Sequence, residues 1–269
     1  MIVRILYIGD VVGEFGLTVV ERLLPSLRKK EAIDLVIAQA ENVTEGRGIS
    51  SQDFKRLLAA GVDFASGGNW ILYEKDIYPL LNDPAEPIIR PANFPKDTPG
   101  LGYKYAHSSV GDVLVVSLLG HVVGRDADRP MDNPLKVIDA ILTSKNLQPH
   151  VATIVNFHGD FSSEKYIIGY YLDGKVTAAI GDHWHIPTAD AMVLPKGTAH
   201  ITDVGMCGSL DSSLGIDFDS VIPRWRDDKS TRNILVKSGR SQFNSLLIEV
   251  DPSSGLATTA KQIRIVEDL

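Results

Sequence analysis

Short runs of apolar and β-branched residues alternate with helical patterns along the first third of the chain. Each run stops at a glycine or a polar residue, and each is followed by residues with helical spacing. The apolar runs are residues 2–8, 35–38 and 64–66, and the helical patterns are residues 16–29, 51–60 and 74–81. Ser50 or Ser51 is placed to cap the second helix. Three strand-to-helix units in succession predict an α/β protein with a parallel sheet.

The pattern continues after an irregular segment, residues 82–105, which is rich in Pro, Gly and Asp. We expect this segment to run over the sheet edge or the site, as the candidate cap of the molecule. Ser162 is expected to cap the second of two further helices. The later strands are predicted at residues 113–119, 151–157 and 176–180, and the helices at residues 134–143 and 163–171. Two short strands at residues 191–194 and 200–202 and a C-terminal pair at residues 243–250 and 262–266 predict a second sheet.

Five of these strands end in side chains that can bind metal ions. In open α/β sheets, ligands bind beyond the carboxyl ends of the strands. The candidate metal ligands at those ends are Asp10, Glu41, Asn42, Asn69, His158, His183 and His185. Oxygen and imidazole donors without cysteine suit iron, manganese or zinc. The joint pattern therefore predicts a metal site at one edge of the sheet.

Taken singly, most of these residues have a plainer interpretation. Asp10, Asn42 and Asn69 would each pass for turn residues, and His158 for a core histidine. His183 and His185 form the strongest pair, because period-two alternation past a strand would let them straddle two ions.

Other polar residues are weighed in the same way. Glu41 has two carboxylate oxygens, so it can bridge two ions. His107, His150 and His200 are interpreted as surface or loop histidines, and His121, which follows a strand, stays open as a functional residue.

Composition and charge limit the kinds of molecule that the chain can bind. The chain has 269 residues, is 44% hydrophobic and carries a formal charge of −7, so it has no basic stripe for a long nucleic acid. A small anionic substrate would need local cations, which bound metal ions can supply. The single cysteine, Cys207, excludes an internal disulfide and Cys-x-x-Cys zinc sites. The apolar start is too short for a signal peptide, and no run reaches the ~18 residues of a membrane span, which predicts a cytoplasmic protein.

A dinucleotide-binding fold is the competing interpretation of residues 9–16. The glycine spacing there is not Gly-x-Gly-x-x-Gly, and Asp10 would place a carboxylate where a pyrophosphate should lie. We therefore reject this alternative.

An ordered series of motifs resembles the YmdB-like bacterial metallophosphoesterases, a branch of the calcineurin-like superfamily. The motifs are distributed over roughly the first four fifths of the chain. They are residues 5–13, 41–42, 90–93, 98–103, 157–158, 163–165, 171–174, 188–190, 194–199 and 201–206. The resemblance implies one domain over residues 1–269 with a four-layer fold, in which two packed β-sheets are flanked by α-helices.

The resemblance also implies a two-metal centre. Asp10 and His185 would bind one ion, and Glu41 would bridge to the second. The ligands of that second ion would be Asn69, His158 and His183, with Asn42 at a further ligand position. Iron or manganese is expected, with zinc as the alternative. The implied activity is hydrolysis of small phosphodiesters, including cyclic nucleotides, by hydroxide made from a bridging water. A homo-oligomer is also implied.

The chain departs from this family at the residue expected to protonate the leaving group. The family has Gly-Asn-His after the third strand, whereas this chain has Gly68, Asn69 and Trp70. It also has Trp184 between the two histidines, where the family has Thr. Trp70 therefore stands at the position of the catalytic histidine, and both indoles are candidate substrate-binding groups.

Three interpretations follow from the loss of this histidine. In the first, the chain is a phosphodiesterase that takes its proton from Asp182, His121 or water, or that acts on a substrate whose leaving group needs little help. In the second, it is an impaired, metal-dependent nucleotide-binding or regulatory protein in which the indoles stack on a base. In the third, the tryptophans only fill volume left by a changed substrate. The first is favoured because the ligand positions are intact.

Overall fold

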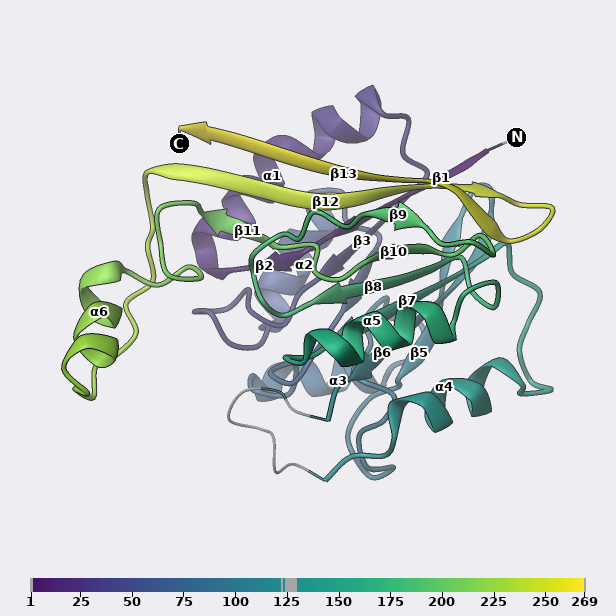
Figure 1. Cartoon of the computed structure of the whole chain (residues 1–269), viewed down its shortest axis with the longest axis horizontal. Helices are drawn as coiled ribbons and strands as arrows, with labels where there is room; N and C mark the ends of the chain where they lie inside the picture. Colours follow the sequence, from purple (N-terminus) through teal and green to yellow (C-terminus); the bar gives the residue numbers. More distant parts are fainter. Residues whose placement is uncertain (1, 122, 124–129, 269) are drawn as a thin grey trace.

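The computed structural model describes residues 2–121, 123 and 130–268, and shows two β-sheets packed face to face (Figure 1). The first sheet has seven strands in the order β2-β11-β12-β1-β3-β4, with β13 paired to β12. Its strands are β1 (Val3–Ile8), β2 (Asp10–Val11), β3 (Leu35–Gln39), β4 (Phe64–Ser66), β11 (Met206–Ser209), β12 (Arg240–Asp251) and β13 (Leu256–Asp268).

The second sheet has six strands in the order β5-β6-β7-β8-β10-β9. They are β5 (Tyr103–Ser108), β6 (Gly111–Leu119), β7 (Ala152–His158), β8 (Ala178–Asp182), β9 (Met192–Val193) and β10 (Ala199–Ile201).

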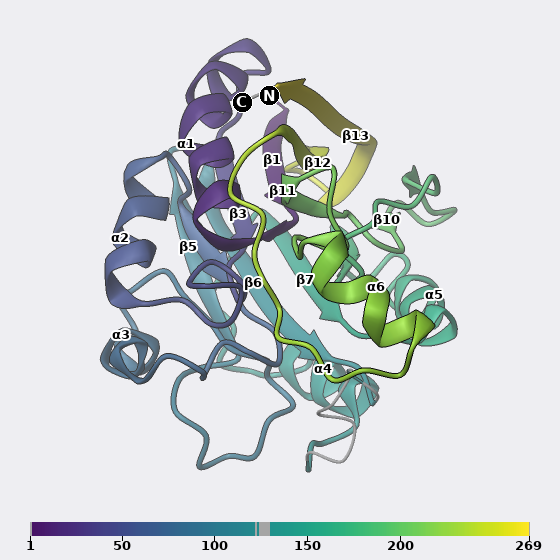
Figure 2. The same cartoon turned by 90° about the vertical axis from the view of Figure 1, so that its left-hand side faces the viewer.

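Helices cover both outer faces of this pair of sheets (Figure 2). One flank carries α1 (Gly13–Lys30), α2 (Ser51–Ala59) and α3 (Tyr78–Asn82), preceded by a 3₁₀ turn, Lys75–Ile77. The other carries α4 (Pro134–Leu142) and α5 (Ser162–Tyr171). A further helix, α6 (Phe218–Arg226), projects from the body of the molecule (Figure 1).

Strand alternation explains why both faces of the first sheet are buried. Val3 and Ile5 of β1 point into the cluster between the sheets, where they meet Val113 and Ile154 of the second sheet. Leu6, on the opposite face of β1, joins the cluster beneath α1 and α2. A third cluster lies between the second sheet and α4 and α5. The expected four layers are therefore confirmed.

The parallel pairing predicted near the N-terminus is confirmed, and the expected place of the C-terminal pair is wrong. β1 pairs parallel to β3, and β3 pairs parallel to β4. The C-terminal hairpin does not help to form the second sheet, because β12 pairs antiparallel with β1, with Val3 opposite Val250. The two short strands β9 and β10 do join the second sheet, through β8.

Two local predictions about helix caps have different outcomes. Ser50 caps α2, because its side chain accepts a hydrogen bond from the amide of Asp53. The N-cap of α5 is Phe161, without a side-chain bond, so Ser162 is inside the helix and the predicted cap was wrong.

The irregular segment, residues 82–105, follows the edges of both sheets. Ile88 forms a parallel bridge with Ala65 of β4, and the amide of Ala92 donates to the carbonyl of Ser117 in β6. The segment thus crosses from the first sheet to the second before it becomes β5. Within the described part of the chain, every helix is too short or too polar to cross a bilayer.

Candidate metal centre

The seven candidate ligands gather beyond the carboxyl ends of strands from both sheets, and four of them, Glu41, Asn42, His183 and His185, line a cleft. Asp10 begins β2 directly after β1, and Glu41, Asn42 and Asn69 follow β3 and β4. His158 is the last residue of β7, and His183 and His185 follow β8. Packing the two sheets face to face therefore brings together residues that are far apart in the sequence.

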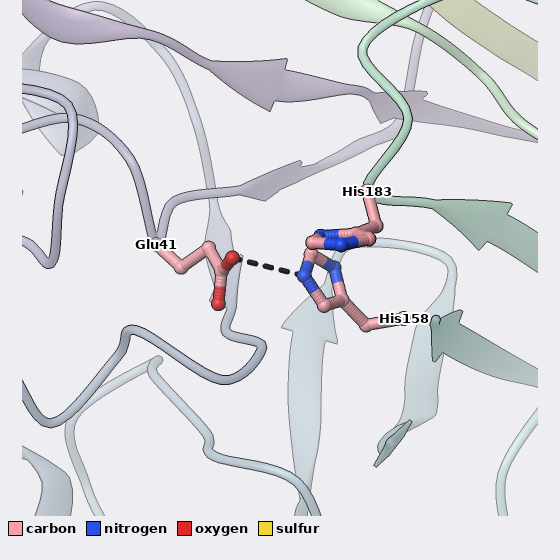
Figure 3. A group of neighbouring side chains, drawn as sticks. All are labelled: Glu41, His158 and His183. Carbon is pink, nitrogen blue, oxygen red and sulfur yellow. Dashed lines mark ion pairs between the residues drawn. The ribbon is translucent and has the colours of Figure 1, made fainter. Parts of the chain in front are cut away.

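Glu41, His158 and His183 lie closest together (Figure 3). Each offers one ligand atom, and these atoms lie within 4.8 Å of one another. Oε1 of Glu41 is 2.9 Å from Nε2 of His158, and the rings of His158 and His183 are 4.4 Å apart. The oxygen Oδ1 of Asn69 is 3.1 Å from the same His158 nitrogen.

A buried carboxylate fixes the orientation of His158. Nδ1 of His158 is 2.7 Å from Oδ1 of Asp182, and both side chains are fully buried. With the Nδ1 proton donated to Asp182, Nε2 faces only oxygen acceptors, those of Glu41 and Asn69. A proton or a metal ion on Nε2 would make these contacts favourable, because the Nε2 lone pair otherwise faces other lone pairs. Carboxylate–histidine–metal triads have this arrangement.

The charges around His158 favour a cation there. Burial alone would lower the pKa of His158, but the Glu41 and Asp182 carboxylates raise it well above its usual value. Burial likewise works against ionisation of Asp182, yet the charge and hydrogen bond of His158 hold the pKa of that carboxyl below its usual value. Asp182 is therefore a positioned anion.

Asp10 and His185 form the other half of the candidate centre. Nε2 of His185 lies 3.8 Å from Oδ1 of Asp10, while Nδ1 faces the carbonyl of Leu214 at 3.2 Å. Burial and the neighbouring His183 lower the pKa of His185 to about 4, so its imidazole is neutral, as a ligand must be. Burial and the nearby Asp182 raise the pKa of Asp10 well above its usual value.

Unsatisfied buried oxygens show that these residues fit metal ions. Oδ1 of Asp10 and Oδ1 of Asn42 are buried and accept no hydrogen bond within the described structure. The buried Oε1 of Glu41 faces Nε2 of His158 at 2.9 Å, a contact that needs a proton or a cation between the two atoms. Buried polar atoms are rarely left unpaired, and hard oxygen donors close to imidazoles suit divalent cations. The family described below implies such ions, and the Glu41 cluster is a candidate site for one.

The turn that carries both histidines is conformationally strained. His183 and His185 have φ angles of 99° and 62°, in a region that non-glycine residues rarely adopt. β8 ends at Asp182, so strand alternation does not place this pair, and that part of the prediction was wrong. The turn sends His183 toward His158 and His185 toward Asp10 instead.

The buried side chain of Lys165 stabilises this turn through hydrogen bonds. Nζ of Lys165 donates to the carbonyl of Asp182 and to Oδ2 of Asp203, both at 2.6 Å, and lies 4.1 Å from the centre of the Trp184 ring. Oδ2 of Asp203 also accepts the amide proton of Trp184, at 2.8 Å. In the sequence, Lys165 belongs to the motif of residues 163–165 inside a predicted helix, and no role at the site was predicted for it.

The cleft beside the candidate ligands has a volume of about 410 Å³. It is lined by Glu41, Asn42, Trp70, Asp160, His183, Trp184, His185, Ile186 and Leu214. Both indoles predicted to bind substrate therefore face it. The amide of Trp70 donates to Oε2 of Glu41 at 2.8 Å, and the indole N–H of Trp184 donates to the carbonyl of Asp160 at 3.0 Å.

Close backbone approach at this cleft depends on Gly68. A Cβ atom there would lie 2.4 Å from Oε2 of Glu41 and 2.5 Å from the His158 ring. Only glycine lets the loop after β4 reach the centre.

Sequence reasoning missed several residues that support the centre. Asp160, whose Oδ1 lies 3.2 Å from Nε2 of His183, follows the candidate ligand His158 by two residues, and that spacing was the available signal. Gln39, Asn156 and Tyr7 surround Asp182. Tyr7 and Asn156 sit inside predicted strands and Gln39 directly follows one, so none of the three was singled out as a site residue.

The remaining histidines lie outside this cluster. His107 and His150 bond to neighbouring surface groups, as expected. His200 is buried in β10 with Nδ1 2.8 Å from the carbonyl of Ala179, so its interpretation as a surface or loop residue was wrong. His121 is half exposed, with Nδ1 2.8 Å from Oε1 of Glu164.

Two packed sheets with outer helices, and carboxylate and imidazole donors at their strand ends, define the metallophosphoesterase class. Within this class, the chain belongs to the YmdB-like protein family, whose model matches residues 6–263.

Three similar proteins agree with this assignment. The 2′,3′-cyclic-nucleotide 2′-phosphodiesterase of Bacillus subtilis (strain 168) is 35% identical over 98% of each chain. The structure of a novel phosphatase from Mycoplasma pneumoniae is 31% identical with a TM-score of 0.91, over 100% of this chain and 95% of that one. The structure of a hypothetical protein from Thermus thermophilus is 34% identical with a TM-score of 0.88, over 98% of this chain and 99% of that one.

Proposed function

We propose that the protein is a phosphoric ester hydrolase that uses two metal ions to cleave small phosphodiesters such as cyclic nucleotides. Iron or manganese is the expected metal. The single observation that carries the proposal is the cluster of Glu41, His158 and His183, whose ligand atoms lie within 4.8 Å of one another, beside the buried, unsatisfied oxygens of Asp10 and Asn42. The names of the similar proteins, which are phosphodiesterases and phosphatases, support the reaction class.

The proposed ligands divide into two groups joined by Glu41. Asp10 and His185 would hold one ion, and Asn69, His158 and His183 the other, with Asn42 as a further ligand of the centre. Bound ions supply an activated water and electrostatic stabilisation of the phosphoryl oxygens. Asp182 keeps the His158 ring oriented, because it accepts the Nδ1 proton.

The chain's own contribution to leaving-group protonation is reduced. Trp70 faces the cleft where the family's histidine is expected. An indole N–H can donate a hydrogen bond, but it does not act as an acid at neutral pH. Asp182 is engaged by His158, Tyr7, Gln39 and Asn156 and is absent from the cleft lining. Water is then the proton donor that the cleft best supports, and losing a positioned acid costs about 100- to 10,000-fold in rate.

Elemental analysis tests the metal centre. Protein expressed with iron and manganese supplements should carry close to two ions per chain. Protein that carries no metal under these conditions would exclude the proposed hydrolase.

Trp70→His tests the role of the missing acid. A nitrophenolate leaves unaided, whereas a ribose alkoxide needs a proton. The wild type should therefore cleave bis(4-nitrophenyl) phosphate measurably and cyclic nucleotides slowly, and Trp70→His should accelerate the cyclic-nucleotide reaction far more. A wild type that turns over cyclic nucleotides at about 1 to 1,000 per second, and that slows in Trp70→His, would contradict the proposal.

The second candidate is a metal-dependent nucleotide-binding protein without turnover. It is favoured by two indoles facing one cleft, since stacking contributes about 1 to 3 kcal/mol per base. In that case the wild type should bind nucleotides without hydrolysis, and Trp70→His should weaken the binding.

A further inference from the structure

Arg47 lies beside Trp70, one of the residues that line the cleft, with its guanidinium over the indole. Its Cζ atom is 4.8 Å from the centre of the Trp70 ring, and the residue is exposed. None of the described residues forms a hydrogen bond or an ion pair with the guanidinium. The group is thus held by its flat face, while its N–H donors stay free.

The backbone around Arg47 is fixed by a tight loop that begins at the candidate bridging carboxylate. The amide of Arg47 donates to the carbonyl of Thr44 at 2.9 Å, and the amide of Thr44 donates to the carbonyl of Gly48 at 3.0 Å. The amide of Gly48 in turn donates to the carbonyl of Glu41. This network connects the position of Arg47 rigidly to that of Glu41.

Trp70 is also bound to the Glu41 carboxylate, through its backbone amide. Its amide donates to Oε2 of Glu41, and the edge of its ring packs against Tyr73, with centroids 5.8 Å apart. A Cβ atom at Gly48 would lie 3.0 Å from Cβ of Tyr73, so the two loops are in close contact. The indole is therefore a fixed platform between the buried centre and the exposed guanidinium.

The charge of the cleft gives Arg47 a role. The described residues that line the cleft include the acids Glu41 and Asp160 but no lysine or arginine. A guanidinium with free, parallel donors matches a phosphate group in a bidentate manner. Because Glu41 is buried and Arg47 exposed, a phosphate held by Arg47 would be a different group from one held at the metal ligands.

We propose that Arg47, held on Trp70, forms a subsite for a phosphomonoester group that the substrate carries in addition to its scissile diester. The inference rests on the proposed function. It gives Trp70 a positive role, because the indole that replaces the expected acid holds a specificity-determining arginine.

Kinetics on three substrates test the subsite. They are bis(4-nitrophenyl) phosphate, adenosine 2′,3′-cyclic phosphate, and adenosine 2′,3′-cyclic phosphate that also carries a 5′-phosphate. Arg47→Ala should raise KM about 10-fold or more for the 5′-phosphorylated substrate, as expected for loss of a charge-assisted hydrogen bond, with kcat unchanged. KM for the other two should change little.

Matched variants separate the specific contact from a change in net charge. Arg264→Ala removes an exposed arginine from β13, outside the cleft lining, and should leave all three KM values unchanged. Trp70→Leu should raise the same KM as Arg47→Ala, by removing the platform. Equal KM changes for all three substrates in Arg47→Ala, or no change, would overturn the subsite.

A binding titration distinguishes failure of the subsite from failure of the proposed function. If none of the three substrates is hydrolysed, the proposed function fails, and adenosine 5′-monophosphate is titrated into metal-loaded protein by calorimetry. Weaker binding by Arg47→Ala than by wild type and Arg264→Ala then supports the subsite. Equal binding, or no binding by wild type, overturns it.

Discussion

Replacing Lys165 with methionine tests whether the strained histidine turn sets the metal affinity. Lys165 donates to the carbonyl of Asp182 and the carboxylate of Asp203, and both acids lie beneath that turn. The φ values of 99° at His183 and 62° at His185 cost on the order of 1–3 kcal/mol each, which surrounding contacts must offset. Without the lysine, we expect the turn to relax toward ordinary backbone angles and to withdraw both imidazoles.

The magnitude follows from the burial of the ion pair. Lys165 and Asp203 are both fully buried, and removing one partner of such a pair costs about 3–5 kcal/mol of the free energy of unfolding. Loss of support for ligand orientation typically lowers metal affinity about 10- to 100-fold. Lys165→Met should therefore show both effects. The first is measured by urea unfolding in a chelator, and the second by competition with a chelator of known affinity.

A second buried lysine provides the control. Nζ of Lys104 donates to the carbonyls of Asp83 and Glu86 at 2.6 and 2.9 Å, on β5 and away from the cleft lining. Lys104→Met should lower the unfolding free energy while metal affinity stays at the wild-type value. If Lys165→Met does not fold, the double variant Lys165→Met/Asp203→Asn removes the unpaired buried charge and is measured instead. Wild-type metal affinity in the folded Lys165 variant would refute the argument.

Three further substitutions probe the centre, each read out as metal content and affinity. His158→Ala should lose metal while His150→Ala keeps it, and a metal-replete His158→Ala protein would show that the strand-end ligands are turn residues only. Asp182→Asn should weaken metal binding about 10- to 100-fold, since the His158 ring loses its acceptor; unchanged affinity would remove that role. Gly68→Ala should displace the Glu41 carboxylate and reduce affinity, whereas Gly208→Ala, whose Cβ atom would make only ordinary contacts of 3.6 Å and beyond, should not; equal affinities would contradict the close approach.

The edge at which the site forms could be predicted because its signals are local. Each βα unit near the N-terminus shows an apolar run, a stop and a helical pattern within a few tens of residues. Parallel strands bring their carboxyl ends to one edge, so Asp10, Glu41 and Asn69 were expected together from the first sheet alone. Packing of the second sheet then adds His158 from β7 and His183 from the turn after β8.

The place of the C-terminal hairpin could not be predicted, because nothing local specifies it. β12 and β13 pair with each other as an antiparallel hairpin, whereas β1, the other partner of β12, lies at the opposite end of the chain. β1 is apolar on both faces, as a central strand of either a parallel or a mixed sheet would be. The sequence therefore shows that β1 is central without showing what lies on its second edge.

Position 70 shows how a proton donor can change while the arrangement of the candidate metal ligands stays the same. Residue 70 contributes its backbone amide to the candidate metal centre. This amide donates to Oε2 of Glu41 and does not depend on the side chain. The adjacent Asn69 supplies the side-chain oxygen near His158. Replacing the expected histidine with tryptophan thus alters what projects into the cleft and leaves the bond to Glu41 in place. A metal centre with all its proposed ligands is for this reason compatible with a changed leaving group or a changed substrate, and the two substrate classes compared in Trp70→His measure that change directly.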